Sequence, residues 1–129
     1  MVVDEALMAY LLTQSGLTAL VSNRIYFLKL PQASNLPAIV IQKIDSPKIH
    51  GFSADIGAMT RIQTTSWALT YSEVSAVQEQ IRTATQNYMN QTMGSVPVKN
   101  IEFDEGPDMY EDDMGRYGKI IDLLIYHTE

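Results

Sequence analysis

Five stretches of the chain have the patterns of β-strands: either apolar side chains recur with a period of two, or apolar side chains fall on both faces, as in a strand that is buried on both sides. The same stretches are rich in β-branched and aromatic residues, which strands favour. Pro31 and Pro37 bound the first two stretches, because proline cannot donate to a strand ladder. The five predicted strands cover residues 24–30, 38–44, 59–71, 97–104 and 116–127.

Three expectations concern how these strands are placed. Residues 24–30 have apolar side chains on both faces, so this strand is expected to be buried on both sides. In the third strand Trp67, Leu69 and Tyr71 share one face, which carries the larger side chains. The last two strands are expected to pair with each other as a hairpin.

Helical periodicity appears first at the start of the chain. Apolar side chains recur at three- and four-residue spacing over residues 4–15, which predicts a helix with Asp4 as its N-cap and Gly16 as its stop. One more helical turn follows at residues 17–21 and is expected to pack under the first helix.

A second, clearer helix follows the third strand. Thr70 and Glu73 have the spacing of a capping box, in which the threonine hydroxyl accepts from the amide three residues on. The helix is expected to end at Gly94. Its apolar stripe consists of Val74, Val77, Ile81, Ala84, Tyr88 and Met89.

The predicted fold is therefore α+β, with the order α-β-β-β-α-β-β. It consists of a mainly antiparallel sheet of about five strands with two helices packed on one face. A chain of 129 residues without an internal repeat is expected to form one domain over residues 1–129.

Charge and composition narrow the class of protein. Fifteen acidic against nine basic residues give a net charge of −6, which argues against binding nucleic acid through its phosphates. The absence of cysteine fits a protein made in a reducing cytoplasm. The N-terminal residues match neither an export signal nor a membrane span, so no membrane partner is expected.

The longest predicted connection covers residues 45–58. Its apolar side chains are too many for a solvated linker, which makes it a candidate for a surface that becomes buried in an assembly. The alternative is a folded-back hairpin tip. The candidate interface residues here are Lys48, Ile49, His50, Phe52 and Ile56.

A second candidate surface is acidic, since residues 102–113 contain seven of the fifteen carboxylates. Clustered carboxylates can bind Ca²⁺ or Mg²⁺, but the spacing does not match a calcium loop, so a solvated or interface loop is favoured over a metal site. The candidate interface residues are Asp108, Tyr110, Glu111, Asp112 and Asp113.

Enzymatic signatures are weak. His50 and His127 are the only histidines, and no serine lies in a nucleophile-elbow pattern, so no catalytic residue, cofactor or metal is predicted. Residues 115–118 have GXXG spacing, but they precede a strand and are read as a turn. Trp67 is either a ligand-stacking platform or, in the favoured interpretation, a core or subunit-interface anchor.

Several short segments, taken in their order along the chain, resemble the tail-completion protein family of long-tailed bacteriophages. The tripeptide ending at Ala68, followed by a capped helix, and the terminal region with Tyr110 and Tyr117 extend the resemblance over nearly the whole chain. The segments that carry it in the N-terminal half are residues 17–21, 24–26, 30–32 and 36–40.

This resemblance implies a structural virion protein that caps the tail tube and joins it to the head-tail connector as a six-membered ring. Its implied partners are other copies of itself, the tail tube protein, the head-tail connector protein and DNA that crosses the lumen without sequence-specific binding. The implied location is the virion, at the head-tail junction, after assembly in the host cytoplasm. An acidic lumen formed by residues 102–113 would not attract the DNA.

The alternative is a small non-viral binding module or stand-alone enzyme of similar α+β fold. Such a protein is expected to be a monomer or dimer with a formed pocket and a titratable group inside it.

Overall fold

The computed structural model describes residues 2–45 and 57–128, and this part of the chain contains three helices and seven strands. The helices are α1 (Val3–Leu12), α2 (Ser15–Val21) and α3 (Tyr71–Thr85). The strands are β1 (Ile25–Phe27), β2 (Ala38–Asp45), β3 (Ala58–Ala68), β4 (Met89–Met93), β5 (Val96–Glu105), β6 (Met109–Glu111) and β7 (Arg116–His127).

The strands form one mixed sheet in the order β1-β2-β3-β7-β5-β4, with β6 also paired to β7. β1 runs parallel to β2, and all other pairs are antiparallel. β7 pairs with β3 along one edge, while β5 and β6 share its other edge. The predicted pairing of the last two long strands is confirmed, but five strands were too few.

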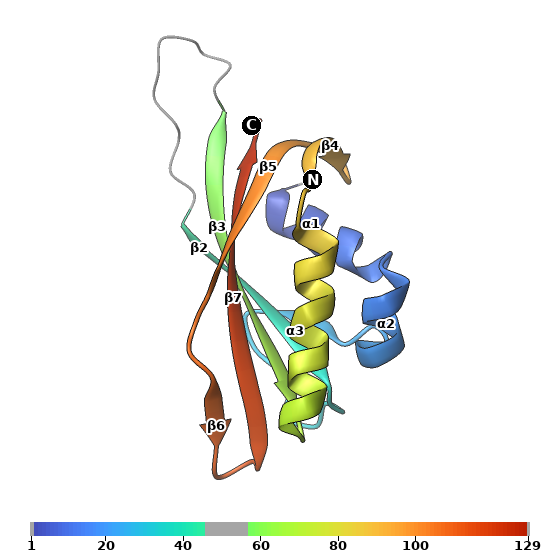
Figure 1. Ribbon diagram of the computed structural model, residues 1–129, viewed down its shortest axis with the longest axis vertical. Helices are drawn as coiled ribbons and strands as arrows, with labels where there is room; N and C mark the ends of the chain where they lie inside the picture. Colours follow the sequence, from blue (N-terminus) through green and yellow to red (C-terminus); the bar gives the residue numbers. More distant parts are fainter. Residues whose placement is uncertain (1, 46–56, 129) are drawn as a thin grey trace.

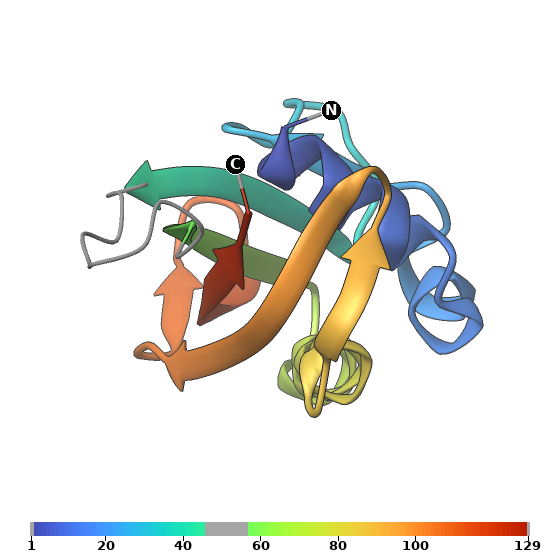
Figure 2. The ribbon, with the colours of Figure 1, turned by 90° about the horizontal axis from the view of Figure 1, so that it is seen from above.

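The helices lie on one face of this sheet (Figure 1), and the sheet curls toward them. α1 contacts both β2 and β4, which lie toward opposite ends of the sheet, so the sheet forms a half-barrel. α3 contacts β3 and β7 at the centre. Figure 2 shows β5 and β4 curving round toward α1.

Alternation along the central strands decides which side chains form the core. On β7, Ile121, Leu123 and Ile125 are fully buried under the helices, whereas their neighbours Asp122 and Leu124 lie on the other face and are only partly buried. Further core residues from the other elements include Leu7, Leu11, Leu17, Ile39, Ile41, Ile62, Val77 and Ile81.

The first helix differs from the prediction at both ends. Val2, not Asp4, occupies the N-cap, and the carboxylate of Asp4 lies inside the first turn, where it accepts from the amide of Glu5 at 3.1 Å. A carboxylate in the first turn also complements the helix dipole. The helix is capped at Thr13, and Gly16 belongs to α2 instead of stopping α1.

The second predicted helix begins as expected and ends early. Thr70 is its N-cap and accepts from the amide of Glu73 at 3.2 Å. The helix ends at Thr85 because its C-cap Gln86 is extended, with φ −66° and ψ 141°, and Asn87 then adopts a left-handed φ of 57°. Tyr88 is buried as expected, but Met89 begins β4 and is exposed.

Two strands are shorter than predicted. β1 ends at Phe27, since Leu28 has a φ of 70° that leaves the extended region. Phe27 and Leu28 are 41% and 70% exposed, so the expectation of burial on both faces was wrong. β3 ends at Ala68, with Leu69 exposed beyond it. The face of β3 that carries Trp67 points away from the helices.

Candidate assembly surface

The helix-free face of the sheet carries an open groove of about 420 Å³. Val40, Thr65 and Ile120 are register neighbours on β2, β3 and β7 and lie in its lining. Leu28 lines the groove from the β1 side and Met109 from the β6 side. Residues beside β1 and on β6 therefore flank one groove.

Trp67 lines this groove in a fixed environment. It is half-buried and lies opposite Gly118, and a Cβ atom added there would come within 2.7 Å of the indole ring. The Arg116 guanidinium lies 4.6 Å from the ring centroid. A ligand that stacked on Trp67 would have to compete with Arg116, which favours an anchor over a stacking platform.

Glu111 holds Arg116 in that position. Arg116 Nε donates to Glu111 Oε1 at 3.0 Å, and Nη2 donates to Oε1 at 2.7 Å and to Oε2 at 3.1 Å. Such forked charge-assisted bonds restrict orientation as well as distance. This pair connects β6 to the first residue of β7, and both carboxylate oxygens of Glu111 are bonded to Arg116.

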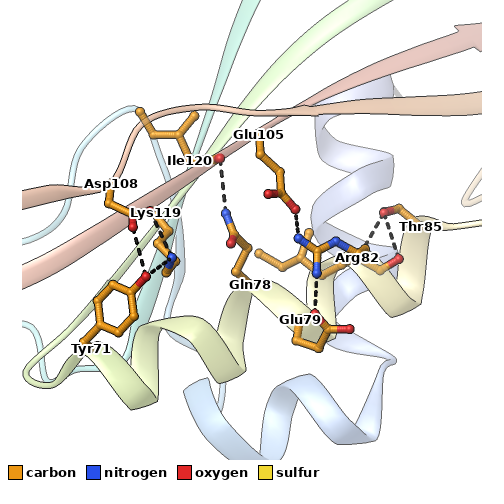
Figure 3. Close-up of polar contacts among 10 residues, drawn as sticks. Tyr71, Gln78, Glu79, Arg82, Thr85, Glu105, Asp108, Lys119 and Ile120 are labelled. Carbon is orange, nitrogen blue, oxygen red and sulfur yellow. Dashed lines mark hydrogen bonds and ion pairs between the residues drawn. The ribbon is translucent and has the colours of Figure 1, made fainter.

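A second polar cluster fastens the segment between β5 and β6 to α3 (Figure 3). Lys119 Nζ donates to Asp108 Oδ1 at 2.9 Å and to the Tyr71 hydroxyl at 3.0 Å, and that hydroxyl donates to Asp108 Oδ2 at 3.0 Å. The Tyr71 ring also lies 4.5 Å from Lys119 Nζ. The three residues come from α3, β7 and the loop between β5 and β6.

The electrostatics of this cluster favour its charged form. Hydrogen bonds from Lys119 and then Tyr71 hold the pKa of Asp108 below its ordinary value. Burial alone would lower the pKa of Lys119, but the bonds to Tyr71 and Asp108 raise it above its ordinary value. Both groups therefore stay ionised at neutral pH.

Beyond these clusters, the turn between β6 and β7 projects from the end of the sheet (Figure 1). We call Tyr110, Asp112, Asp113 and Met114 the hairpin tip. Tyr110 and Met114 are 52% and 50% exposed, and both aspartates are exposed. Tyr110 packs against Tyr117 with ring centroids 4.8 Å apart, which gives the tip an aromatic base.

On the side of the sheet away from β6, the outermost strand is β1. We call Phe27, Leu28, Lys29 and Lys43 the β1 edge; Lys29 follows the strand, and Lys43 lies on the adjacent β2. The two apolar side chains are exposed, as are both lysines. Phe27, Leu28 and Lys43 line a second groove of about 410 Å³ next to the start of α1.

The structure brings six of the predicted interface residues to one end of the sheet. Trp67 is the last but one residue of β3, Asp108 precedes β6, and the others lie on β6 or its turn: Tyr110, Glu111, Asp112 and Asp113. Asp108 and Glu111 are bonded to Lys119 and Arg116, a feature that the acidic run alone did not reveal. Lys48, Ile49, His50, Phe52 and Ile56 lie outside the described residues.

The β1 edge was missed because its two apolar residues were assigned to a buried strand. The signal in the sequence was Pro31, which lies only three or four residues after Phe27 and Leu28. Proline is confined to strand ends and edge strands, so these two residues were candidates for an exposed edge. The basic partners Arg116 and Lys119 were also missed, and no local pattern in the sequence marks them.

Groups that could support catalysis are already engaged. The His127 ring is buried, with Nε2 at 2.7 Å from the Thr60 hydroxyl and Nδ1 at 2.9 Å from the Thr128 carbonyl oxygen. Across residues 2–45 and 57–128, three or more side chains able to bind a metal ion do not come together. In the same ranges, each helix is too short or too polar to cross a membrane.

The described surface offers an apolar edge, an acidic tip and polar groups that are bonded within the chain. Comparison with protein families gives the class of the protein. The family model "Tail completion protein gp17" matches residues 5–127, and the chain belongs to this family. It is a phage-like tail completion protein and a structural component of the virion, and the family is not enzymatic. The alternative of a stand-alone enzyme was therefore wrong.

The fold also occurs in a solved particle. A chain of a structure titled "Virion of native gene transfer agent (GTA) particle" superposes with a TM-score of 0.70 over 98% of this chain and 95% of that chain, at 11% sequence identity. At this identity the likeness concerns the fold. A search of curated proteins found no match.

Proposed function

We propose that this protein caps the tail tube and joins it to the head-tail connector as a six-membered ring. Membership of the tail completion family over residues 5–127 is the observation that carries this proposal. Its partners are then further copies of the chain, the tail tube protein and the connector protein. The ring sits at the head-tail junction of the virion after assembly in the host cytoplasm.

The surface of the domain supports a ring. A closed ring needs two different, complementary surfaces on each subunit, because each copy meets its two neighbours through opposite sides. The β1 edge and the hairpin tip are two such surfaces, one with exposed lysines and the other with exposed aspartates. They lie at opposite ends of the series of paired strands β1-β2-β3-β7-β6.

The charge distribution supports a channel through which DNA passes without sticking. Most of the described basic side chains are bonded within the chain, as Arg82 is to Glu105 (Figure 3). Glu102 and Asp104 are exposed on β5. A lumen lined by such carboxylates lacks the counterion release that drives DNA binding.

One predicted segment is left to contact the tube or the connector. The apolar residues of the segment at 45–58 make it a proposed contact with one of these partners. Its proposed contact residues are Lys48, Ile49, His50, Phe52 and Ile56. Trp67 and the paired residues Asp108 and Glu111 are proposed to support the hairpin tip from behind.

Polymerisation of the cognate tail tube protein tests this function. Purified chain added to growing tubes is expected to bind one tube end and stop elongation, so that tube length falls as its concentration rises. A heat-denatured sample of the same chain is the control. Tubes that keep growing with the native chain at saturating concentration would contradict the proposed capping function.

A further inference from the structure

Within the ring of the proposed function, on which this inference rests, we infer that neighbouring copies meet head to tail. The β1 edge of one copy contacts the hairpin tip of the next. Apolar side chains, charges and the placement of the two surfaces in the sheet support this pairing.

The β1 edge presents an apolar side chain from a strained position. Leu28 is 70% exposed and has a φ of 70°, a region that a leucine rarely adopts. Such strain persists where surrounding structure enforces it, and here the Leu28 amide donates to the Ile41 carbonyl at 2.9 Å. Together with Phe27, it offers an exposed apolar surface that a second copy can cover.

The hairpin tip presents matching side chains. Tyr110 and Met114 are about half exposed, and tyrosine is a residue type that often dominates the binding energy of interfaces. The base of the tip is rigid, because Arg116 is bonded to Glu111 and Tyr110 packs on Tyr117. A rigid aromatic surface loses little conformational entropy when it binds.

Charge adds direction to the contact. Within residues 2–45 and 57–128, Lys29 and Lys43 are the basic side chains without a bonded partner. The remaining described basic residues all have partners: Arg24, Arg61, Arg82, Lys99, Arg116 and Lys119. Both lysines belong to the β1 edge, opposite in sign to Asp112 and Asp113 at the tip.

The start of α1 modifies this charge. Asp4 and Glu5 line the groove that contains Phe27 and Lys43, whereas Lys29 does not line it. The positive charge of the β1 edge therefore rests mainly on Lys29. This makes Lys29 the cation expected to meet the acidic tip of the next copy.

The topology makes the contact directional. β1 and β6 are outer strands on opposite sides of β7 in the path β1-β2-β3-β7-β6. A contact between unlike surfaces is heterologous, and repetition of one such contact generates a ring if the rotation closes. A contact between two β1 edges would instead end at a dimer.

Cysteine cross-linking tests the pairing directly, because the native chain contains no cysteine. Full-length Leu28→Cys and Tyr110→Cys proteins are mixed and treated with a short bifunctional maleimide, so that a product can form only between copies. The matched control replaces Tyr110→Cys with Met89→Cys, which is 51% exposed on β4. Sedimentation of the untreated native chain is measured in parallel.

A cross-linked dimer in the Leu28→Cys and Tyr110→Cys mixture, at least tenfold more abundant than in either variant alone or in the control, would support the inference. A native chain that sediments as a ring without this cross-link would overturn the inference and leave the proposed function standing. A native chain that stays monomeric and uncross-linked, even on tail tubes, would overturn both.

Charge reversal gives an independent readout. Lys29→Glu is expected to weaken ring assembly about tenfold. Mixing this variant with a second protein that carries both Asp112→Lys and Asp113→Lys is expected to restore assembly. Lys99→Glu, at an exposed position on β5 outside both surfaces, is the control for the same change of net charge. Equal loss in the control, or failure of the reversed pair to recover, would contradict the proposed contact.

Discussion

Trp67 on β3 lies against Gly118 on β7, so closely that a Cβ atom at position 118 would come within 2.7 Å of the indole ring. The glycine leaves space for the ring on the helix-free face. Arg116, two residues earlier on β7, lies over the same indole and is fixed by Glu111. The contact therefore couples the end of β3 to the base of the hairpin tip.

Gly118→Ala is expected to lower the free energy of unfolding by about 1–3 kcal/mol, because the added methyl group overpacks against Trp67. Urea denaturation measures the loss. The same substitution in a Trp67→Leu background should cost clearly less, since the ring that it meets is gone. An equal cost in both backgrounds would show that the contact is not the cause.

Trp67→Ala is expected to cost about 1–3 kcal/mol, below the range for a fully buried tryptophan, because the ring is half-buried on the outer face. Part of the loss comes from the contact with Arg116. Thermal and urea denaturation give the value. An unchanged stability with lost ring assembly would instead make Trp67 a direct interface residue.

Asp108→Asn tests the bonded cluster through pH. The folded-state pKa of Asp108 is lowered, so its contribution is present at neutral pH and is lost as pH falls below about 4. The difference in unfolding free energy between native chain and variant should therefore shrink from pH 7 to pH 3. Asp113→Asn, an exposed control, should show little difference at either pH.

Leu28→Gly is expected to separate stability from assembly. Glycine adopts the φ of 70° without strain and the native side chain is mostly exposed, so the free energy of unfolding should hold or rise by up to about 1 kcal/mol. Ring formation, measured by sedimentation, should weaken. Leu28→Ala, which keeps the strained backbone, is the matched control and should also weaken the ring.

The long strands and the start of α3 could be predicted because each has a strong local signal. β7 is strongly apolar and its burial alternates from Lys119 to His127, and Thr70 and Glu73 form the predicted cap. β4 could not be predicted, since its sequence is polar and four of its five residues are exposed, so its pairing with β5 defines it. β6 has three residues, too few to show a period.

The candidate surface was predictable only in part. The acidic run marked the hairpin tip, since Asp112 and Asp113 are exposed there. The sequence could not show that Asp108 pairs with Lys119, because that contact depends on how β7 and the loop before β6 meet. The exposure of Leu28 was likewise hidden, since its left-handed backbone is set by the fold and not by a local motif.

Electron microscopy of tail tubes incubated with the purified chain tests whether the chain caps the tube as a ring. We expect a six-fold ring at one end of each tube, with a mass near six times 14.5 kDa, or 87 kDa, beyond the tube itself. Tube ends that stay bare at saturating concentration, or chain bound along the tube walls instead of at an end, would contradict it.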